Sequence, residues 1–193
     1  MSNSFIGIIP ARYASTRFPG KPLAKIGSMT MIERVYRQVS KELDDIMVAT
    51  DDNRIVEAVK SFGGNVTMTS SEHRSGTDRC YEAYRNCGSQ ASVVINIQGD
   101  EPFINPTQIA ELKSCFDDAS TDIATLARRY DSKKGFEGLF DPNVVKVVRG
   151  QKEMAIYFSR AIIPYVRNHQ WQEWLEHVPF LTHVGMYGYR ADT

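Results

Sequence analysis

Short apolar runs alternate with amphipathic stretches along most of this chain, and no other feature of the sequence constrains the fold as much. The runs have strand length and are rich in Ile and Val, which favours β-strands. Such alternation is typical of an α/β fold with a doubly wound, mainly parallel sheet. Strands are expected at Phe5–Ile9, Ile46–Thr50, Val66–Thr69, Val93–Ile97, Asp122–Leu126, Val144–Val148 and, broken by glycine, at Val184–Tyr189.

Capping residues mark the helix starts between these strands. Thr30 opens a capping-box pattern, and Asn105 followed by Pro106 is typical of a helix N-terminus. Ser75 or Thr77 is the expected N-cap of a further helix. Each start precedes apolar residues at helical spacing, so three helices are predicted at these positions.

The second half of the chain has a looser pattern. An irregular excursion is expected from Arg128 to Phe140, and the strand that follows should carry Lys146 on the face opposite its valines. The stretch Arg167–Glu176 is typical of a partly exposed flap or interface. Its tryptophans, Trp171 and Trp174, fit either a dimer interface or ordinary packing.

The composition limits the class of protein. At 193 residues with 42% apolar content, the chain is expected to form a single α/β domain. Lys plus Arg and Asp plus Glu both number 23, so nothing favours nucleic-acid binding. The 3 cysteines include no CxxC pair and are expected to be reduced. No signal peptide or membrane span is recognised, and these features predict a cytoplasmic protein.

A cationic loop follows the first predicted strand. Arg12, Arg17 and Lys21 lie within ten positions of one another, with Ser15 and Gly20 between them. Glycine and serine let backbone N–H groups approach anionic oxygens, and the cations would neutralise a leaving pyrophosphate. The loop lacks the GxxxxGK[ST] spacing of the ATPase P-loop. A triphosphate-binding loop is therefore one interpretation, and a solvated basic surface loop is the other.

The polar segment SSEHRSGTDR leads into the helix predicted after Ser75. Free N–H groups and the positive end of the helix dipole would lie beside Arg74 and Arg79. This arrangement fits an anion site, but a capped helix with exposed arginines is equally compatible with it.

A second polar turn, QGDEP, follows the strand Val93–Ile97. Asp100 comes where nucleotide-binding α/β proteins place a metal carboxylate, and Mg²⁺ takes one or two carboxylates together with phosphate oxygens. The alternative is a tight turn with Gly99 at a positive φ and Asp100 exposed.

Topology brings these two loops together. In a doubly wound sheet the first strand is central and the fourth lies beside it, so the loop of Arg12–Lys21 and the loop of Asp100 should flank one crevice. A cationic cradle opposite a metal carboxylate suits attack on a nucleoside triphosphate. The four histidines are scattered, which argues against a zinc site, and His183 alone would be taken as structural.

Seven blocks of sequence carry a resemblance to a known family. They are IIPARYASTRFPGKPL, VATDD, HRSGTDR, NIQGDEP, NVVKVV, YFSRA and HVGMYGYR. In this order they resemble the 3-deoxy-manno-octulosonate (Kdo) cytidylyltransferases, also called CMP-Kdo synthetases. The resemblance covers nearly the whole chain. It implies a sheet of the nucleotide-diphospho-sugar transferase type and transfer of CMP from CTP to Kdo for lipopolysaccharide biosynthesis.

The resemblance also implies roles for individual residues. The nucleotide-binding set is Arg12, Ser15, Arg17, Lys21, Ser75, Gly76 and Arg79. Asp100 matches a Mg²⁺ ligand and, with Arg12 and Lys21, makes up the catalytic set. The sugar-acid pocket corresponds to Gln98, Arg160, His183 and Tyr187, which makes a functional role for His183 the expectation. The family further implies a homodimer, with CTP and Kdo as its small-molecule partners.

Two alternatives stay open at this point. The chain ends at Thr193, before a block in which the family carries a second magnesium aspartate, and is therefore expected to lack the family's C-terminal segment. A nucleotide-binding domain without turnover is one alternative. A related CMP-sugar-acid synthetase, such as one for sialic acid, is the other.

Overall fold

The computed structural model describes residues 3–14 and 18–193, which form two compact units. The first unit comprises the chain up to Ala124 together with Met186–Thr193, and the second comprises Thr125–Gly185. The division into compact units does not test whether the chain is a single α/β domain, and that expectation stays a prediction. In the described part of the chain, no helix has the length and apolar character needed to cross a membrane.

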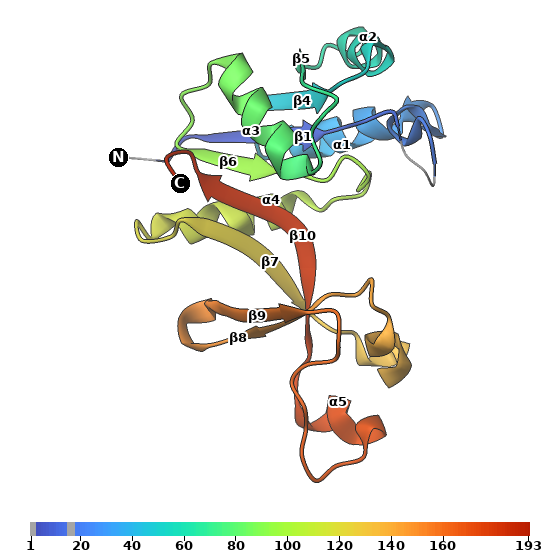
Figure 1. Cartoon of the computed structure of the whole chain (residues 1–193), viewed down its shortest axis with the longest axis vertical. Helices are drawn as coiled ribbons and strands as arrows, with labels where there is room; N and C mark the ends of the chain where they lie inside the picture. Colours follow the sequence, from blue (N-terminus) through green and yellow to red (C-terminus); the bar gives the residue numbers. More distant parts are fainter. Residues whose placement is uncertain (1–2, 15–17) are drawn as a thin grey trace. The chain divides into compact units, whose positions relative to one another are not determined.

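A mainly parallel sheet forms the centre of the first unit (Figure 1). Its strands are β5 (Val66–Met68), β4 (Ile46–Thr50), β1 (Phe5–Pro10), β6 (Val93–Asn96) and β10 (Leu181–Arg190), in this spatial order, and β7 (Ile123–Arg129) also pairs with β10. The first four are parallel to one another, whereas β10 is antiparallel to β6. β6 therefore lies beside β1, as predicted for a doubly wound sheet.

The first unit contains the helices α1 (Met31–Val39), α2 (Asn53–Ser61), α3 (Gly76–Cys87) and α4 (Pro106–Ser114). The starts of α1, α3 and α4 agree with the three helix starts that the sequence predicts. Thr30 Oγ1 accepts the Glu33 N–H at 3.3 Å, and Asn105 caps α4 with Pro106 in its first turn. Short elements complete the unit: η1 (Lys21–Leu23), β2 (Lys25–Ile26), β3 (Met29–Thr30) and η2 (Cys115–Asp117).

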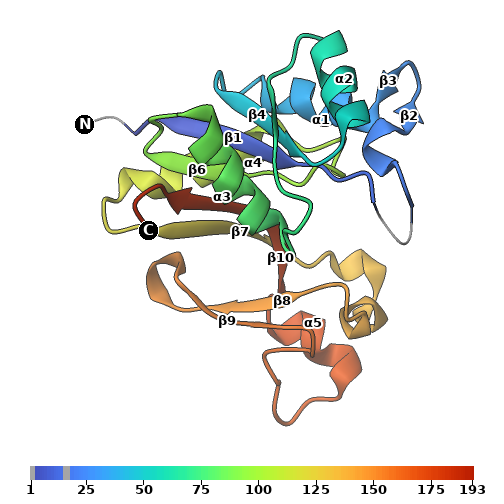
Figure 2. The same ribbon diagram turned by 45° about the horizontal axis from the view of Figure 1, so that its top comes forward.

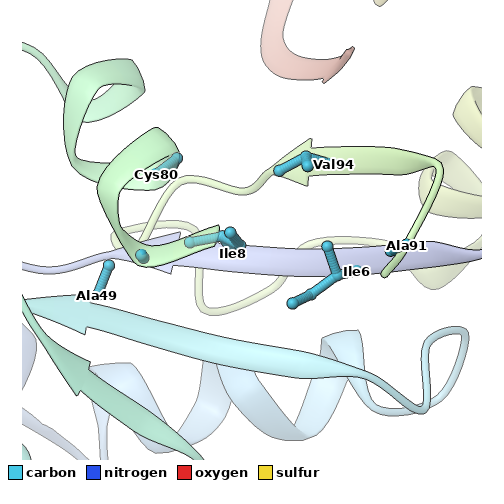
Figure 3. Close-up of a cluster of buried hydrophobic side chains, with 7 residues drawn as sticks. Ile6, Ile8, Ala49, Cys80, Ala91 and Val94 are labelled. Atoms are coloured by element: carbon cyan, nitrogen blue, oxygen red, sulfur yellow. The ribbon is translucent and has the colours of Figure 1, made fainter. Parts of the chain in front are cut away.

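Helices cover both faces of this sheet. On one face, Ile6 and Ile8 of β1 and Val94 of β6 are packed with Cys80 of α3 (Figure 3). Figure 2 shows α3 lying across these two strands. The alternate residue of β1, Gly7, points the other way, where a Cβ would meet side chains of α1 and of the loop after it. The doubly wound α/β prediction is thus confirmed.

The second unit contains shorter elements. They are η3 (Ser132–Lys134), η4 (Phe136–Phe140), β8 (Lys146–Arg149), η5 (Gln151–Glu153), β9 (Ala155–Ser159), η6 (Trp171–Glu173) and α5 (Trp174–His177). β8 pairs antiparallel with β9 and with the first residues of β10. The two short 3₁₀ helices η3 and η4 account for the irregular excursion that the sequence predicts.

Aromatic side chains form the core of the second unit. Trp174 is 8% exposed and lies 5.6 Å from the Phe136 ring centroid, with Phe180 stacked at 6.3 Å. The Trp171 ring lies 5.2 Å from Phe136 on the rim of this core. Of the two interpretations of the tryptophan pair, the contacts therefore favour ordinary packing.

Lys146 is buried, which its predicted place on the face opposite the valines does not by itself indicate. The strand begins at Lys146 itself, and the whole residue is buried at 0% exposure. Its Nζ donates to the backbone carbonyls of Val144 and Arg160, each at 2.6 Å, and of Asp141 at 3.2 Å. Burial lowers the pKa of the Lys146 ammonium. The Lys146 ammonium is buried because carbonyl groups outside the strand accept its hydrogen bonds. The alternation of residues along a strand gives no information about such acceptors.

We predict that Lys146→Met lowers the free energy of unfolding by about 3 kcal/mol, because three carbonyls lose a charged donor at about 1 kcal/mol or more each. Urea denaturation followed by tryptophan fluorescence measures the change. Lys133→Met is the control, since Lys133 is exposed and should shift stability by no more than about 0.5 kcal/mol. Equal stabilities of the two variants would contradict a supporting role for the buried ammonium.

Candidate active site

A cleft of about 530 Å³ opens in the first unit at the carboxyl ends of β1 and β6. Its lining residues are Pro10, Ala11, Arg12, Phe18, Lys21, Pro22, His73, Arg74, Ser75, Gly76, Arg79, Gln98, Gly99 and Asp100. The three polar segments that the sequence singles out therefore meet in one place. Ligands of open α/β sheets bind in this position, because the loops that follow adjacent parallel strands converge there.

The loop after β1 supplies exposed cations to the cleft. Arg12 is exposed, and Lys21 lies at the first position of η1. Gly20 has a φ of 71°, a conformation that disfavours a side chain, and its N–H donates to the Tyr13 carbonyl at 2.9 Å. This bond closes the loop and returns Lys21 to the cleft. The predicted nucleotide ligands Ser15 and Arg17 lie outside the described residues.

The loop after β6 supplies the carboxylate. Lys21 Nζ lies 2.6 Å from Asp100 Oδ2, and these side chains are 37% and 53% exposed. A pair this exposed is worth at most about 1 kcal/mol and exchanges readily for another partner. Asp100 is exposed, as the tight-turn interpretation also expected.

Gly99 brings the two loops close together. A Cβ on Gly99 would lie 2.7 Å from the Pro10 carbonyl oxygen, nearer than any side chain can come. The glycine is thus required by close backbone approach. The positive φ considered as an alternative is wrong, because Gly99 is not among the glycines with positive φ.

The N-terminus of α3 forms the third wall. Ser75 is the N-cap, and its Oγ accepts the Asp78 N–H at 3.1 Å. Gly76 is the first helical residue and lines the cleft with Ser75. The first N–H groups of a helix this long, together with its dipole, attract anions. This wall and the cations of the β1 loop give the cleft two sources of positive potential.

Arg79 has a different environment from the other cations. It is 4% exposed, and its guanidinium donates to Thr69 Oγ1 at 2.6 Å and to Asp51 Oδ2 at 2.8 Å. These partners lie just beyond the ends of β5 and β4, so Arg79 joins α3 to the sheet. Its predicted role as a nucleotide ligand stays a prediction, whereas its contacts are those of a residue that positions the helix N-terminus.

Among the predicted sugar-acid residues, Gln98 and Tyr187 belong to the first unit. Gln98 lines the cleft directly before Gly99. Tyr187 lies on β10 opposite Asn96 of β6, and burial raises the pKa of its hydroxyl. Tyr187 is not among the lining residues of the cleft.

Arg160 and His183 belong to the second unit. Arg160 is exposed, donates to the Pro142 carbonyl at 2.6 Å and lines a second, aromatic cavity with Trp171. His183 Nε2 lies 2.9 Å from Thr125 Oγ1, and burial lowers the pKa of this imidazole. A neutral imidazole beside a hydroxyl can act as a hydrogen-bonding group toward a polar ligand.

Two residues in or beside the cleft were not singled out in the sequence. His73 lines the cleft and is paired with the Glu82 carboxylate. The Ser70 N–H, and after it His73, hold the pKa of Glu82 below its usual range. Asn96 is 3% exposed, and its Oδ1 has no hydrogen-bond partner among the described residues. His73 and Glu82 are nine positions apart, so no local sequence pattern indicates their pairing. Asn96 belongs to an otherwise apolar strand, so the sequence gives no sign of its role.

The fold and the cleft define the class of protein: an α/β protein that binds nucleotides at the carboxyl ends of its strands. The model of the family described as "Cytidylyltransferase" matches residues 6–193. A 3-deoxy-manno-octulosonate cytidylyltransferase of Parabacteroides distasonis is 60% identical over 97% of this chain, and one of Phocaeicola vulgatus is 56% identical over the same share. The chain spans 75% of the length of each.

A solved structure agrees with these relatives. It is that of a CMP:2-keto-3-deoxy-manno-octonic acid synthetase complexed with CTP, with a TM-score of 0.88 and 40% identity over 98% of this chain and 75% of that one. This chain belongs to the cytidylyltransferase family, among the 3-deoxy-manno-octulosonate cytidylyltransferases. The predicted family, fold class and nucleotidyltransferase class are confirmed.

We predict that Arg79→Met lowers the free energy of unfolding by about 3 kcal/mol, because it leaves the Asp51 carboxylate and the Thr69 hydroxyl without their donor. Urea denaturation gives the value. Arg74→Met is the matched control, since Arg74 is exposed on the same cleft wall. Unchanged stability of Arg79→Met together with weakened CTP binding would instead identify Arg79 as a direct ligand.

Proposed function

We propose that this chain transfers CMP from CTP to the anomeric hydroxyl of Kdo and releases pyrophosphate. The observation that carries the proposal is the cleft in which Arg12 and Lys21, the N-terminus of α3 and the Asp100 carboxylate meet. The relatives' name and the CTP in the related structure support the choice of substrates. CTP is an intracellular nucleotide, so the proposed reaction belongs in the cytoplasm. Because Kdo is a sugar acid of lipopolysaccharide, the proposed pathway is lipopolysaccharide biosynthesis.

The triphosphate would lie between the β1 loop and α3. Its oxygens would accept from the Ser75–Gly76 end of α3, while Arg12 and Lys21 would neutralise the departing pyrophosphate. Ser15 and Arg17 belong to the same proposed set. The anomeric hydroxyl loses its proton to water, its oxygen forms the new bond to the α-phosphorus, and the bond to the bridging oxygen of pyrophosphate breaks. Most of the acceleration would come from positioning and charge stabilisation.

The donors at the cleft fit a magnesium ion. Mg²⁺ prefers one or two carboxylates and takes the rest of its ligands from water and phosphate. Asp100 offers an exposed carboxylate that already attracts a cation, Lys21, at 2.6 Å. When bound, the metal would supply charge neutralisation at the attacked phosphate. Lys21 would then be available to the phosphate oxygens.

The proposed sugar-acid ligands are Gln98, Arg160, His183 and Tyr187. A guanidinium can pair with the Kdo carboxylate through two parallel hydrogen bonds, which is the role proposed for Arg160. The neutral imidazole of His183 and the phenol of Tyr187 can hydrogen-bond sugar hydroxyls.

Pyrophosphate release tests the function. The chain is incubated with CTP, Kdo and Mg²⁺, and release is expected only when all three are present, with UTP failing to replace CTP. Release with sialic acid in place of Kdo would move the proposal to a related synthetase. Mg²⁺-dependent CTP binding without any release would mark a nucleotide-binding domain without turnover.

We expect Asp100→Asn to reduce turnover on the order of 100-fold, because an amide loses the negative charge that would hold the metal. CTP binding, measured by isothermal titration calorimetry, should survive in part through the cations. Glu72→Gln is the control, since Glu72 is an exposed carboxylate of the segment that leads into α3. Unchanged turnover of Asp100→Asn would remove Asp100 from the metal role.

We further propose that two copies of this chain associate through β9. The strand exposes large apolar side chains, with Ile156 at 68% and Tyr157 at 62% exposure, and Met154 just before it is at 69%. A strand edge with such side chains invites pairing, and a second copy offers the same edge in antiparallel orientation about a two-fold axis.

The test is the molar mass in solution. Light scattering on the eluted chain should give the mass of a dimer, and Ile156→Lys should shift it toward the monomer. Ile123→Lys is the control, because Ile123 is similarly exposed at 55% but lies outside β9. A monomeric wild-type chain, or a dimer that withstands Ile156→Lys, would contradict an interface at β9.

A further inference from the structure

His169, Glu173 and His177 are brought together on the surface of the second unit. One metal-ligand atom from each lies within 4.8 Å of the others. The His169 and His177 ring centroids are 3.6 Å apart, and His169 Nδ1 lies 3.7 Å from Glu173 Oε2. Glu173 and His177 lie four residues apart in the helical segment formed by η6 and α5, which places them on one side of it. His169 precedes this segment, next to its N-cap Gln170. The sequence predicts scattered histidines, and for His169 and His177 this prediction is wrong.

The backbone that carries the three side chains is anchored. The indole Nε1 of Trp174 donates to the His169 carbonyl at 3.1 Å, and the Val178 N–H donates to the Trp174 carbonyl at 3.0 Å. Trp174 itself is held in the aromatic core. The first histidine and the helix that carries the second are therefore both tied to one buried residue.

The carboxylate is oriented as well. Gln170 and Glu173 form a capping box, in which the Gln170 N–H donates to Glu173 Oε2 at 3.3 Å. Metal ligands are commonly positioned by such outer hydrogen bonds, which raise affinity. The capping box fixes the rotamer of Glu173 on the side where the histidines lie.

We propose that His169, Glu173 and His177 bind a divalent transition-metal ion, and that Zn²⁺ is the ion they fit. Two imidazoles and one carboxylate are a zinc ligand set, with a fourth position left to water. Neighbouring ligand atoms of a tetrahedral zinc ion lie about 3.4 Å apart, as its bond lengths require. Side-chain rotations that move the ligand atoms by about an ångström would therefore close the cluster around the ion. Imidazole donors favour zinc over Mg²⁺, so the proposed magnesium site at Asp100 is chemically distinct.

Binding would stabilise the segment from His169 to His177. This segment supplies part of the wall of the aromatic cavity that Arg160 also lines. An ion that binds the folded chain alone raises its stability by mass action. Zinc is thus expected to hold this part of the cavity wall in its folded conformation.

Zinc binding is measured on the full chain, without a histidine tag, after chelator treatment and with excess Mg²⁺ present. Equilibrium dialysis with elemental analysis should give one more zinc per chain for the wild type than for a His169→Asn, His177→Asn double variant. Glu173→Gln should weaken binding at this site at least about tenfold. Glu176→Gln is the matched control, being an exposed carboxylate of the same helix outside the cluster. Equal zinc content and affinity in the wild type and the double variant would overturn the proposal.

Cobalt substitution gives a second measurement. Co²⁺ at this site should show visible bands of a four- or five-coordinate ion, without the thiolate charge-transfer band that binding at the exposed Cys115 would give. The bands should vanish in the double variant and persist in Glu176→Gln. Spectra that are the same in the wild type and the double variant would assign the metal to other residues and overturn the proposal. Far-UV circular dichroism checks that the surface substitutions leave the fold intact.

Discussion

The parallel pairing of β1 with β6 is the constraint on which the rest of the site depends. Each strand ends in a polar loop, and the register that pairs Ile8 with Asn96 brings both loops to the same edge of the sheet. Gly99 then lets the second loop approach the Pro10 carbonyl more closely than any side chain would permit. The pair Lys21–Asp100 follows from that approach. A bulkier residue at Gly99 would separate the two loops and thereby widen the cleft between the cations and the carboxylate.

Burial divides the cations of the cleft into two kinds. Arg79 is almost wholly buried and is committed to Asp51 and Thr69, so releasing its guanidinium would leave a carboxylate without its partner. Arg12 is exposed, and Lys21 is held through an exposed pair that costs little to break. Positively charged side chains therefore serve two purposes in this cleft. The buried Arg79 fixes the start of α3, and the exposed Arg12 and Lys21 remain able to bind an anionic ligand.

The sheet and the cleft could be predicted from sequence because they depend on local signals and on topology. Apolar runs mark the strands, Ser75 marks the start of α3, and the strand order of a doubly wound sheet brings Asp100 to the β1 loop. Lys146 and Asn96 could not be placed in this way. Lys146 contacts two carbonyls within five residues and a third at Arg160, and Asn96 is enclosed by strands distant in sequence. Periodicity does not report which polar side chains become buried. The pairing of His169 with His177 was missed for a related reason, since the 3₁₀ turn before α5 leaves no apolar stripe to mark a helix.

The buried ammonium of Lys146 connects the packing of the second unit to its proposed sugar-acid residue. Lys146 Nζ donates to the Arg160 carbonyl at 2.6 Å, which fixes the backbone at the end of β9. The Arg160 side chain is nevertheless exposed, and its guanidinium donates to the Pro142 carbonyl. A guanidinium whose backbone is fixed loses less entropy when it pairs with a carboxylate than one on a free loop. The hydrogen bond from one buried lysine thus contributes to the preorganisation of a neighbouring arginine.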